Sequence, residues 1–83
     1  MKLVLVDWFD HSSSPDGWHD IEEYQTESFP LACQSVGWVV HEDKDIMVIV
    51  PHRYLPRDGY KQRGSGDLTV LKRAIKRIKV LKG

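Results

Sequence analysis

Three runs of branched aliphatic and aromatic residues, each of strand length, fill much of the first 52 positions and constrain the fold more than any other feature. They span residues 3–9, 31–42 and 45–52. Such side chains pack well on a pleated sheet, so the chain is predicted to be mainly β. In the first run, apolar residues occupy both faces: Leu3, Leu5 and Phe9 on one, Val4, Val6 and Trp8 on the other. This strand is therefore expected to be covered on both sides.

A tight polar turn, Asp43-Lys44, separates the second and third runs and predicts a β-hairpin. Gly37 beside Trp38 indicates a bend or bulge, the feature that lets a small sheet curl into a barrel. Trp8 and Trp38 are assigned to the core because indole rings bury a large apolar area.

The segment between the first two runs contains turn-forming residues and then a helical pattern. Residues 11–18 (HSSSPDGW) concentrate Ser, Pro, Asp and Gly, which favour a loop. Residues 19–26 suit one short helix, with Asp20 as its cap and acidic residues in its first turn. Pro30 ends this helix.

The last third of the chain begins with a long basic loop, residues 53–66, and continues into a segment with two interpretations. Apolar residues recur there at helical spacing: Leu68, Leu71, Ile75 and Ile78. That spacing suits a basic amphipathic helix capped by Asp67. The same residues also form two short strands, 68–71 and 75–81, around a turn at 72–74, and periodicity alone does not separate the two.

Length and composition limit the class of protein. A chain of 83 residues is one domain with a small core, for which self-association into a homo-oligomer is a common remedy. No apolar run approaches the length of a membrane span, and the N-terminal stretch lacks the cleavage site of a signal peptide. The single Cys33 excludes an intrachain disulfide, which suits a reducing, cytoplasmic compartment.

Charge is divided between the two halves of the chain although the net charge is zero. Residues 1–52 carry about −8 (two Lys against ten carboxylates), and residues 53–83 carry about +8 (ten basic against two acidic residues). This asymmetry predicts a basic surface for an anionic partner, unless folding pairs the two halves internally.

Cations and aromatic rings alternate in the basic loop, as phosphate binding and base stacking require. The candidate ligand-binding residues of this loop are Arg53, Tyr54, Arg57, Tyr60, Lys61 and Arg63. Lys72 and Arg73 lead a second basic set, whose alternative role is to discourage edge pairing. The remaining candidates are Ser12, Ser13, Ser14 and Trp18. The serine hydroxyls suit sugar or base edges or simply local turns, and Trp18 is a candidate for stacking.

No pattern in the sequence indicates catalysis, a cofactor or a metal. His11, His19, His41 and His52 lack the spacing of a metal site, and no nucleophile elbow or P-loop occurs. Cys33 has no neighbour that would activate it and is expected to be a buried structural thiol. The protein is therefore predicted to be non-enzymatic.

Several short motifs resemble those of a group of small bacteriophage and prophage proteins. They are Trp8, Asp10, Ser12-Ser13-Ser14, Gly17-Trp18, Glu22-Glu23, Ser35-Val36-Gly37-Trp38, Glu42-Asp43, Gly66-Asp67-Leu68-Thr69 and the basic segment 72–81. The resemblance extends over nearly the whole chain, and it implies a phage protein without implying a chemistry.

The run Val70-Leu71-Lys72-Arg73-Ala74-Ile75 resembles the last two strands of Sm-like proteins of the Hfq type. That resemblance implies two strands with a tight turn, with Lys72 and Arg73 facing a nucleotide pocket at a subunit boundary. Sm-like chains begin with a helix, whereas this chain begins with a strand. The expected fold is a small SH3-like or Sm-like curled antiparallel barrel of about five strands, with one short helix between strands one and two.

The function expected from these residues is binding of an anionic nucleotide-type ligand, without catalysis. In a phage this suggests sequestration of a host cyclic-nucleotide immune signal, that is, an anti-defence sponge. The alternatives are an RNA- or DNA-binding Sm-like module and an acidic-surface inhibitor of a host enzyme, which would use the N-terminal carboxylates.

Overall fold

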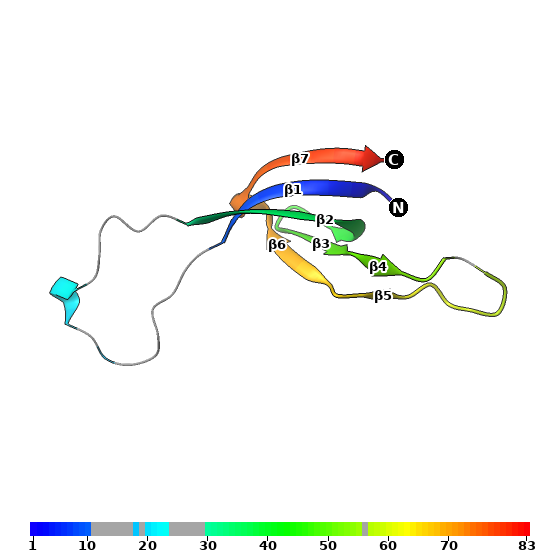
Figure 1. Cartoon of the computed structure of the whole chain (residues 1–83), viewed down its shortest axis with the longest axis horizontal. Helices are drawn as coiled ribbons and strands as arrows, with labels where there is room; N and C mark the ends of the chain where they lie inside the picture. Colours follow the sequence, from blue (N-terminus) through cyan, green and yellow to red (C-terminus); the bar gives the residue numbers. More distant parts are fainter. Residues whose placement is uncertain (11–17, 19, 24–29, 56) are drawn as a thin grey trace.

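Five antiparallel strands form one open sheet in a computed structural model that describes residues 1–10, 18, 20–23, 30–55 and 57–83 (Figure 1). The order across the sheet is β6-β3-β2-β1-β7, and a separate two-stranded ribbon pairs β4 with β5. The strands are β1 (Leu3–Asp10), β2 (Leu31–Glu42), β3 (Ile46–Val50), β4 (His52–Arg53), β5 (Gly64–Ser65), β6 (Leu68–Leu71) and β7 (Ile75–Lys82), with 3₁₀ turns η1 (Ile21–Glu23) and η2 (Lys72–Ala74). The predicted mainly β class is confirmed.

Strand β1 lies between β2 and the edge strand β7, and it pairs with both. Its Val4 and Val6 are buried because they face the interior of the curved sheet. The other face is only partly covered, since Leu3 and Leu5 are half-buried and Phe9 is exposed. The expectation of a strand covered on both sides is therefore wrong: the sheet has one interior face.

The core is small and comes mainly from β1, β3 and β6. In the described part of the chain its buried apolar side chains are Val4, Val6, Met47, Ile49 and Val70; Val50 is also buried, but it is paired with Trp38 on the other face of the sheet. Trp8 packs against this cluster, and its indole Nε1 donates a hydrogen bond to Ser35 Oγ at 3.0 Å. Trp38, in contrast, is paired with Leu3 and lies half-buried on the opposite face, so only Trp8 contributes to the core.

The predicted hairpin of β2 and β3 is confirmed, and Asp43 organises its turn. Asp43 Oδ1 accepts hydrogen bonds from the backbone N–H of Asp45 at 2.8 Å and of Ile46 at 2.9 Å. His41 Nε2 lies 2.9 Å from the other carboxylate oxygen. The hydrogen bond to His41, followed by the two backbone donors, lowers the pKa of Asp43 from 3.8 to about 2.

We expect Asp43→Ala to lower the free energy of unfolding, and Asp43→Asn to lower it less, because asparagine keeps a carbonyl oxygen for the two backbone donors. A lowered folded pKa stabilises the fold above the unfolded value and ceases to do so as pH falls through the folded value. The difference between wild type and Asp43→Ala should therefore shrink between pH 3.8 and about 2. Urea unfolding across that range measures it; a constant difference would contradict the assignment.

The C-terminal segment forms two strands, which rules out the amphipathic helix. Strand β6 pairs with β3, and β7 pairs with β1, so the two segments lie at opposite edges of the sheet. The turn between them is η2, where the Lys72 N–H donates to the Asp45 carbonyl at 2.8 Å and the Ile75 N–H donates to the Lys72 carbonyl. Val70 and Ile75 then reach the core from its two sides.

Three details of the expected fold require correction. No closed barrel forms from the described residues, because the edge strands β6 and β7 are not paired with each other. The described part of the predicted helix 19–26 contains only the single 3₁₀ turn η1, and its other residues lie outside the described ones. The loop 53–66 is shorter than expected, since β4 and β5 pair at its base. Across the described ranges, no helix is long and apolar enough to span a membrane.

Candidate ligand-binding site

The two-stranded ribbon continues directly from the core. Strand β3 passes through Pro51 into β4, and β4 pairs with β5 through His52 with Ser65 and Arg53 with Gly64. The pairing extends one step further, because the Tyr54 N–H donates to the Arg63 carbonyl at 2.9 Å. The ribbon projects beyond the sheet at the end where β3 finishes and β6 begins (Figure 1).

Gly64 allows β5 to approach the core closely. A Cβ atom at this position would lie 3.1 Å and 3.2 Å from the two methyl groups of Val50. Val50 is itself buried, on the face of the sheet that carries Trp38. A side chain at position 64 would therefore push β5 away from β3.

Arg53 is held by stacking rather than by a counter-charge. Its guanidinium carbon lies 4.8 Å from the centroid of the Trp38 ring, a cation–π contact worth about 0.5–2 kcal/mol. The Arg53 Nε atom is buried and has no hydrogen-bond partner within the described ranges. A buried donor without a partner costs stability unless another group satisfies it. The stacking thus positions this side chain, while its buried Nε–H donor has no partner within the described ranges.

A hollow of about 320 Å³ lies beside Arg53. It is lined by His52, Arg53, Tyr54, Arg63, Gly64 and Ser65. Arg53 of β4 and Arg63, the residue just before β5, both line this hollow, and no carboxylate of the described residues forms an ion pair with either. Tyr54, which also lines the hollow, is 57% exposed and so is available for contact with a ligand.

The outer loop carries a second stacked pair, outside the hollow. Arg57 lies 4.9 Å from the centroid of the Tyr60 ring, and the Tyr60 N–H donates to the Arg57 carbonyl at 3.3 Å. Lys61, which follows Tyr60 in the sequence, is exposed. Of the six residues predicted in this loop, the structure therefore places Arg53, Tyr54 and Arg63 at the hollow, and Arg57, Tyr60 and Lys61 beyond it.

Lys72 and Arg73 lie at the other end of β3 and β6. The register pairs Ile46 with Leu71 at that end, whereas the ribbon begins after Val50. Lys72 forms an ion pair with Glu42, and its hydrogen bond to that carboxylate lowers the Glu42 pKa. Lys72 and Arg73 instead line a separate hollow of about 310 Å³. Within one chain, the two predicted basic sets do not form a common pocket.

The other predicted residues add little to this site. Ser12, Ser13 and Ser14 lie outside the described residues, and Trp18 is fully exposed. Cys33 is a half-buried free thiol rather than a buried one. No group of three or more His, Cys, Asp or Glu side chains that could hold a metal occurs among the residues the structure describes.

Sequence reasoning missed His52 and Trp38 as parts of the site. The histidines were considered for their spacing, which tests a metal site and not a ligand pocket. Trp38 was assigned to the core because of its large apolar ring. The register of the β2–β3 hairpin could have identified Trp38. It pairs Trp38 with Val50 on the partly open face, and Val50 lies three positions before Arg53. Comparison with protein-family models, curated proteins and solved structures finds no match to this chain.

Proposed function

We propose that this chain is a non-enzymatic binding protein for a small anionic ligand of the nucleotide type, held at the hollow of the β4–β5 ribbon. The observation that carries the proposal is the pair Arg53 and Arg63, which share one hollow and lack a carboxylate partner within the described residues. By contrast, Lys72 is neutralised by Glu42 and Arg77 by Asp7. Because the two guanidinium groups are not neutralised, they attract an anion more strongly than Lys72 or Arg77 does.

The chemistry of the lining favours a phosphate attached to a flat ring. A guanidinium group binds phosphate through two parallel N–H donors, which distinguishes it from lysine. The Tyr54 ring beside the two arginines offers a face for base stacking, which is worth about 1–3 kcal/mol per base. The hollow of about 320 Å³ falls at the low end of the range for small-molecule sites, and so suits one nucleotide unit.

The same proposal includes an SH3-like or Sm-like fold and assembly into a homo-oligomer. The return of β7 to pair with β1, and the 3₁₀ turn that joins the edge strands, support an SH3-like or Sm-like curled sheet. The core is small, and Leu71, Ile78 and Val80 on the edge strands are exposed apolar residues. Both facts support a homo-oligomer, in which Lys72 and Arg73 of one copy meet the ribbon of the next.

The resemblance to phage proteins supports a biological setting in a bacterial host cytoplasm. There, a phage protein with a phosphate-selective hollow and no catalytic machinery would act by sequestering a host cyclic-nucleotide signal. Such a protein has to bind its ligand tightly and leave it unchanged.

Calorimetric titration with cyclic dinucleotides, mononucleotides and short RNA oligomers, each at two salt concentrations, tests the proposal. Enclosed binding of one nucleotide unit predicts saturation at a fixed stoichiometry with weak salt dependence. An RNA-binding module would instead require several phosphate contacts and lose affinity about 10³-fold or more between 50 and 200 mM salt. Steep loss with RNA, and no binding of nucleotides, would overturn the proposal. Recovery of the cyclic dinucleotide unchanged after incubation would confirm the absence of catalysis.

A further inference from the structure

A bulge in β7 places two neighbouring cations at a third hollow, which shares no lining residue with the hollow of the ribbon. Trp8 pairs with Ile75 and Asp7 pairs with Arg77, so Lys76 is the extra residue on β7. Bulges re-aim side chains, and here Lys76 and Arg77 both line a hollow of about 690 Å³. This volume falls within the range of small-molecule sites.

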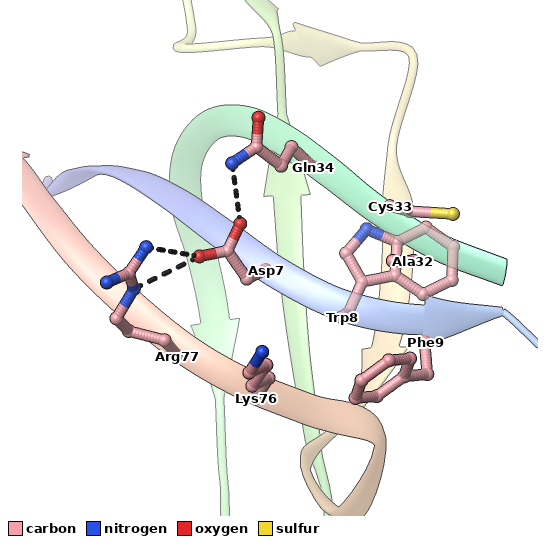
Figure 2. Close-up of a pocket in the computed structure, with 8 residues that line it drawn as sticks. All are labelled: Asp7, Trp8, Phe9, Ala32, Cys33, Gln34, Lys76 and Arg77. Carbon is pink, nitrogen blue, oxygen red and sulfur yellow. Dashed lines mark hydrogen bonds and ion pairs between the residues drawn. The ribbon is translucent and has the colours of Figure 1, made fainter. Parts of the chain in front are cut away.

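Arg77 and Asp7 form a fixed ion pair on one side of this hollow (Figure 2). Arg77 Nε donates to Asp7 Oδ2 at 3.1 Å, and a terminal guanidinium nitrogen lies 3.0 Å from the same oxygen. Gln34 Nε2 donates to the other oxygen at 2.8 Å. The hydrogen bond from Gln34, followed by the contacts with Arg77, lowers the Asp7 pKa, so this carboxylate is ionised at neutral pH and cancels the Arg77 charge.

Lys76 supplies the uncancelled charge. In the view of Figure 2 its ammonium group lies between the Asp7–Arg77 pair and the ring of Phe9. No carboxylate in the described part of the chain forms an ion pair with it. The three charged groups therefore leave the hollow with a net charge of +1 at neutral pH (two cations against one carboxylate).

The remaining walls are apolar. Phe9, Trp8, Ala32 and Cys33 line this side of the hollow. The pairing of β1 with β7 ends at Trp8, so Phe9 has no strand partner on that edge among the described residues, and it is partly exposed. Trp8 is held by its hydrogen bond to Ser35. An apolar wall that faces a single uncancelled cation suits a ligand with one apolar part and one negative charge.

We propose that this hollow is a second binding site, and that it takes a small aromatic monoanion with its carboxylate at Lys76 and its ring against Phe9. One negative charge matches the net charge of the site, and a flat ring matches the open edge of β1. The site is independent of the ribbon and of the function proposed for it.

Titration of ¹⁵N-labelled protein with indole-3-acetate tests this site, with the neutral indole-3-acetamide as the matched probe. The side-chain N–H signals of Gln34 and Trp8 report on the hollow, because both residues line it and both N–H groups are held in hydrogen bonds. We expect both signals to shift with the carboxylate, and the amide to bind at least tenfold more weakly. Equal binding of the two probes, or no shift at millimolar carboxylate, would overturn the proposal.

Substitutions then assign the charge. Lys76→Gln should weaken indole-3-acetate binding about tenfold, the equivalent of one charge-assisted hydrogen bond, whereas Lys76→Arg should retain it. Lys79→Gln, on the same strand but outside the hollow, is the control and should bind as wild type. Equal weakening by both Gln variants would show a general charge effect and would contradict the site. Arg53→Gln should leave this titration unchanged, which separates the result from that of the ribbon.

Discussion

Replacing Gly37 by alanine is expected to lower the free energy of unfolding by about 1–3 kcal/mol, the usual cost of overpacking a core. Gly37 is buried in β2, where a Cβ atom would lie 2.9 Å from the Val50 carbonyl oxygen and 3.1 Å from Ile49 Cβ. The first neighbour is backbone, so relief requires moving β3 itself. Valine at the same position should destabilise the fold more than alanine does.

Urea unfolding followed by tryptophan fluorescence measures this effect. Gly83→Ala is the matched control, because nothing lies within 4 Å of a Cβ at that terminal position. The control should leave the unfolding midpoint unchanged. A Gly37→Ala protein as stable as wild type would show that β2 and β3 do not approach as closely as described.

The largest functional effect is expected for the double variant Arg53→Gln/Arg63→Gln. Hydrogen bonds to charged groups contribute about 1.5–3 kcal/mol each, so loss of two should weaken nucleotide binding by at least about 100-fold. Each single variant should lose roughly tenfold or more. Calorimetric titration with the cyclic dinucleotide or mononucleotide that binds wild type most tightly provides the measurement.

Arg73→Gln is the informative comparison, since Arg73 is exposed and lies away from the hollow of the ribbon. Wild-type affinity of this variant would confine the site to one chain. A loss comparable with that of Arg53→Gln would instead show that a neighbouring copy contributes its η2 turn. Unfolding curves of each variant separate lost binding from lost stability, because Arg53 also stacks on Trp38.

The strands were predictable because their signals are local. Alternation, the Asp43-Lys44 turn and the Pro and Gly positions located β1, β2 and β3 to within a residue or two at most ends. The last segment was ambiguous because Leu68, Leu71, Ile75 and Ile78 satisfy both a helical and an extended pattern. The choice between helix and strands depends on partners that are distant in sequence: Val70 pairs with β3, and Ile75 pairs with β1. The periodicity of the segment itself carries no information about these partners.

The site was predictable only in part for the same reason. Arg53, Tyr54 and Arg63 line one hollow because β4 and β5 pair. The alternation of basic and aromatic residues indicated ligand-binding candidates in this segment, but the segment was predicted to be a loop rather than a paired ribbon. The separation of Lys72 from that hollow follows from the β3–β6 register, and its neutralisation follows from a contact with Glu42, thirty positions earlier. A count of charges along the chain does not show which cations are neutralised by a carboxylate or which lie close together in the fold.

Gly64 lies close enough to the buried Val50 that even a Cβ atom would be crowded, so the ribbon packs directly against the sheet. Any molecule that bridges Arg53 and Arg63 therefore resists separation of β4 from β5, and with it the opening of β3. By mass action, occupancy at a hundred times the dissociation constant raises the free energy of unfolding by about 2.7 kcal/mol. The melting temperature of this small protein is thus a direct detector of its ligand, and a thermal-shift screen of metabolites can find that ligand whatever its chemical identity.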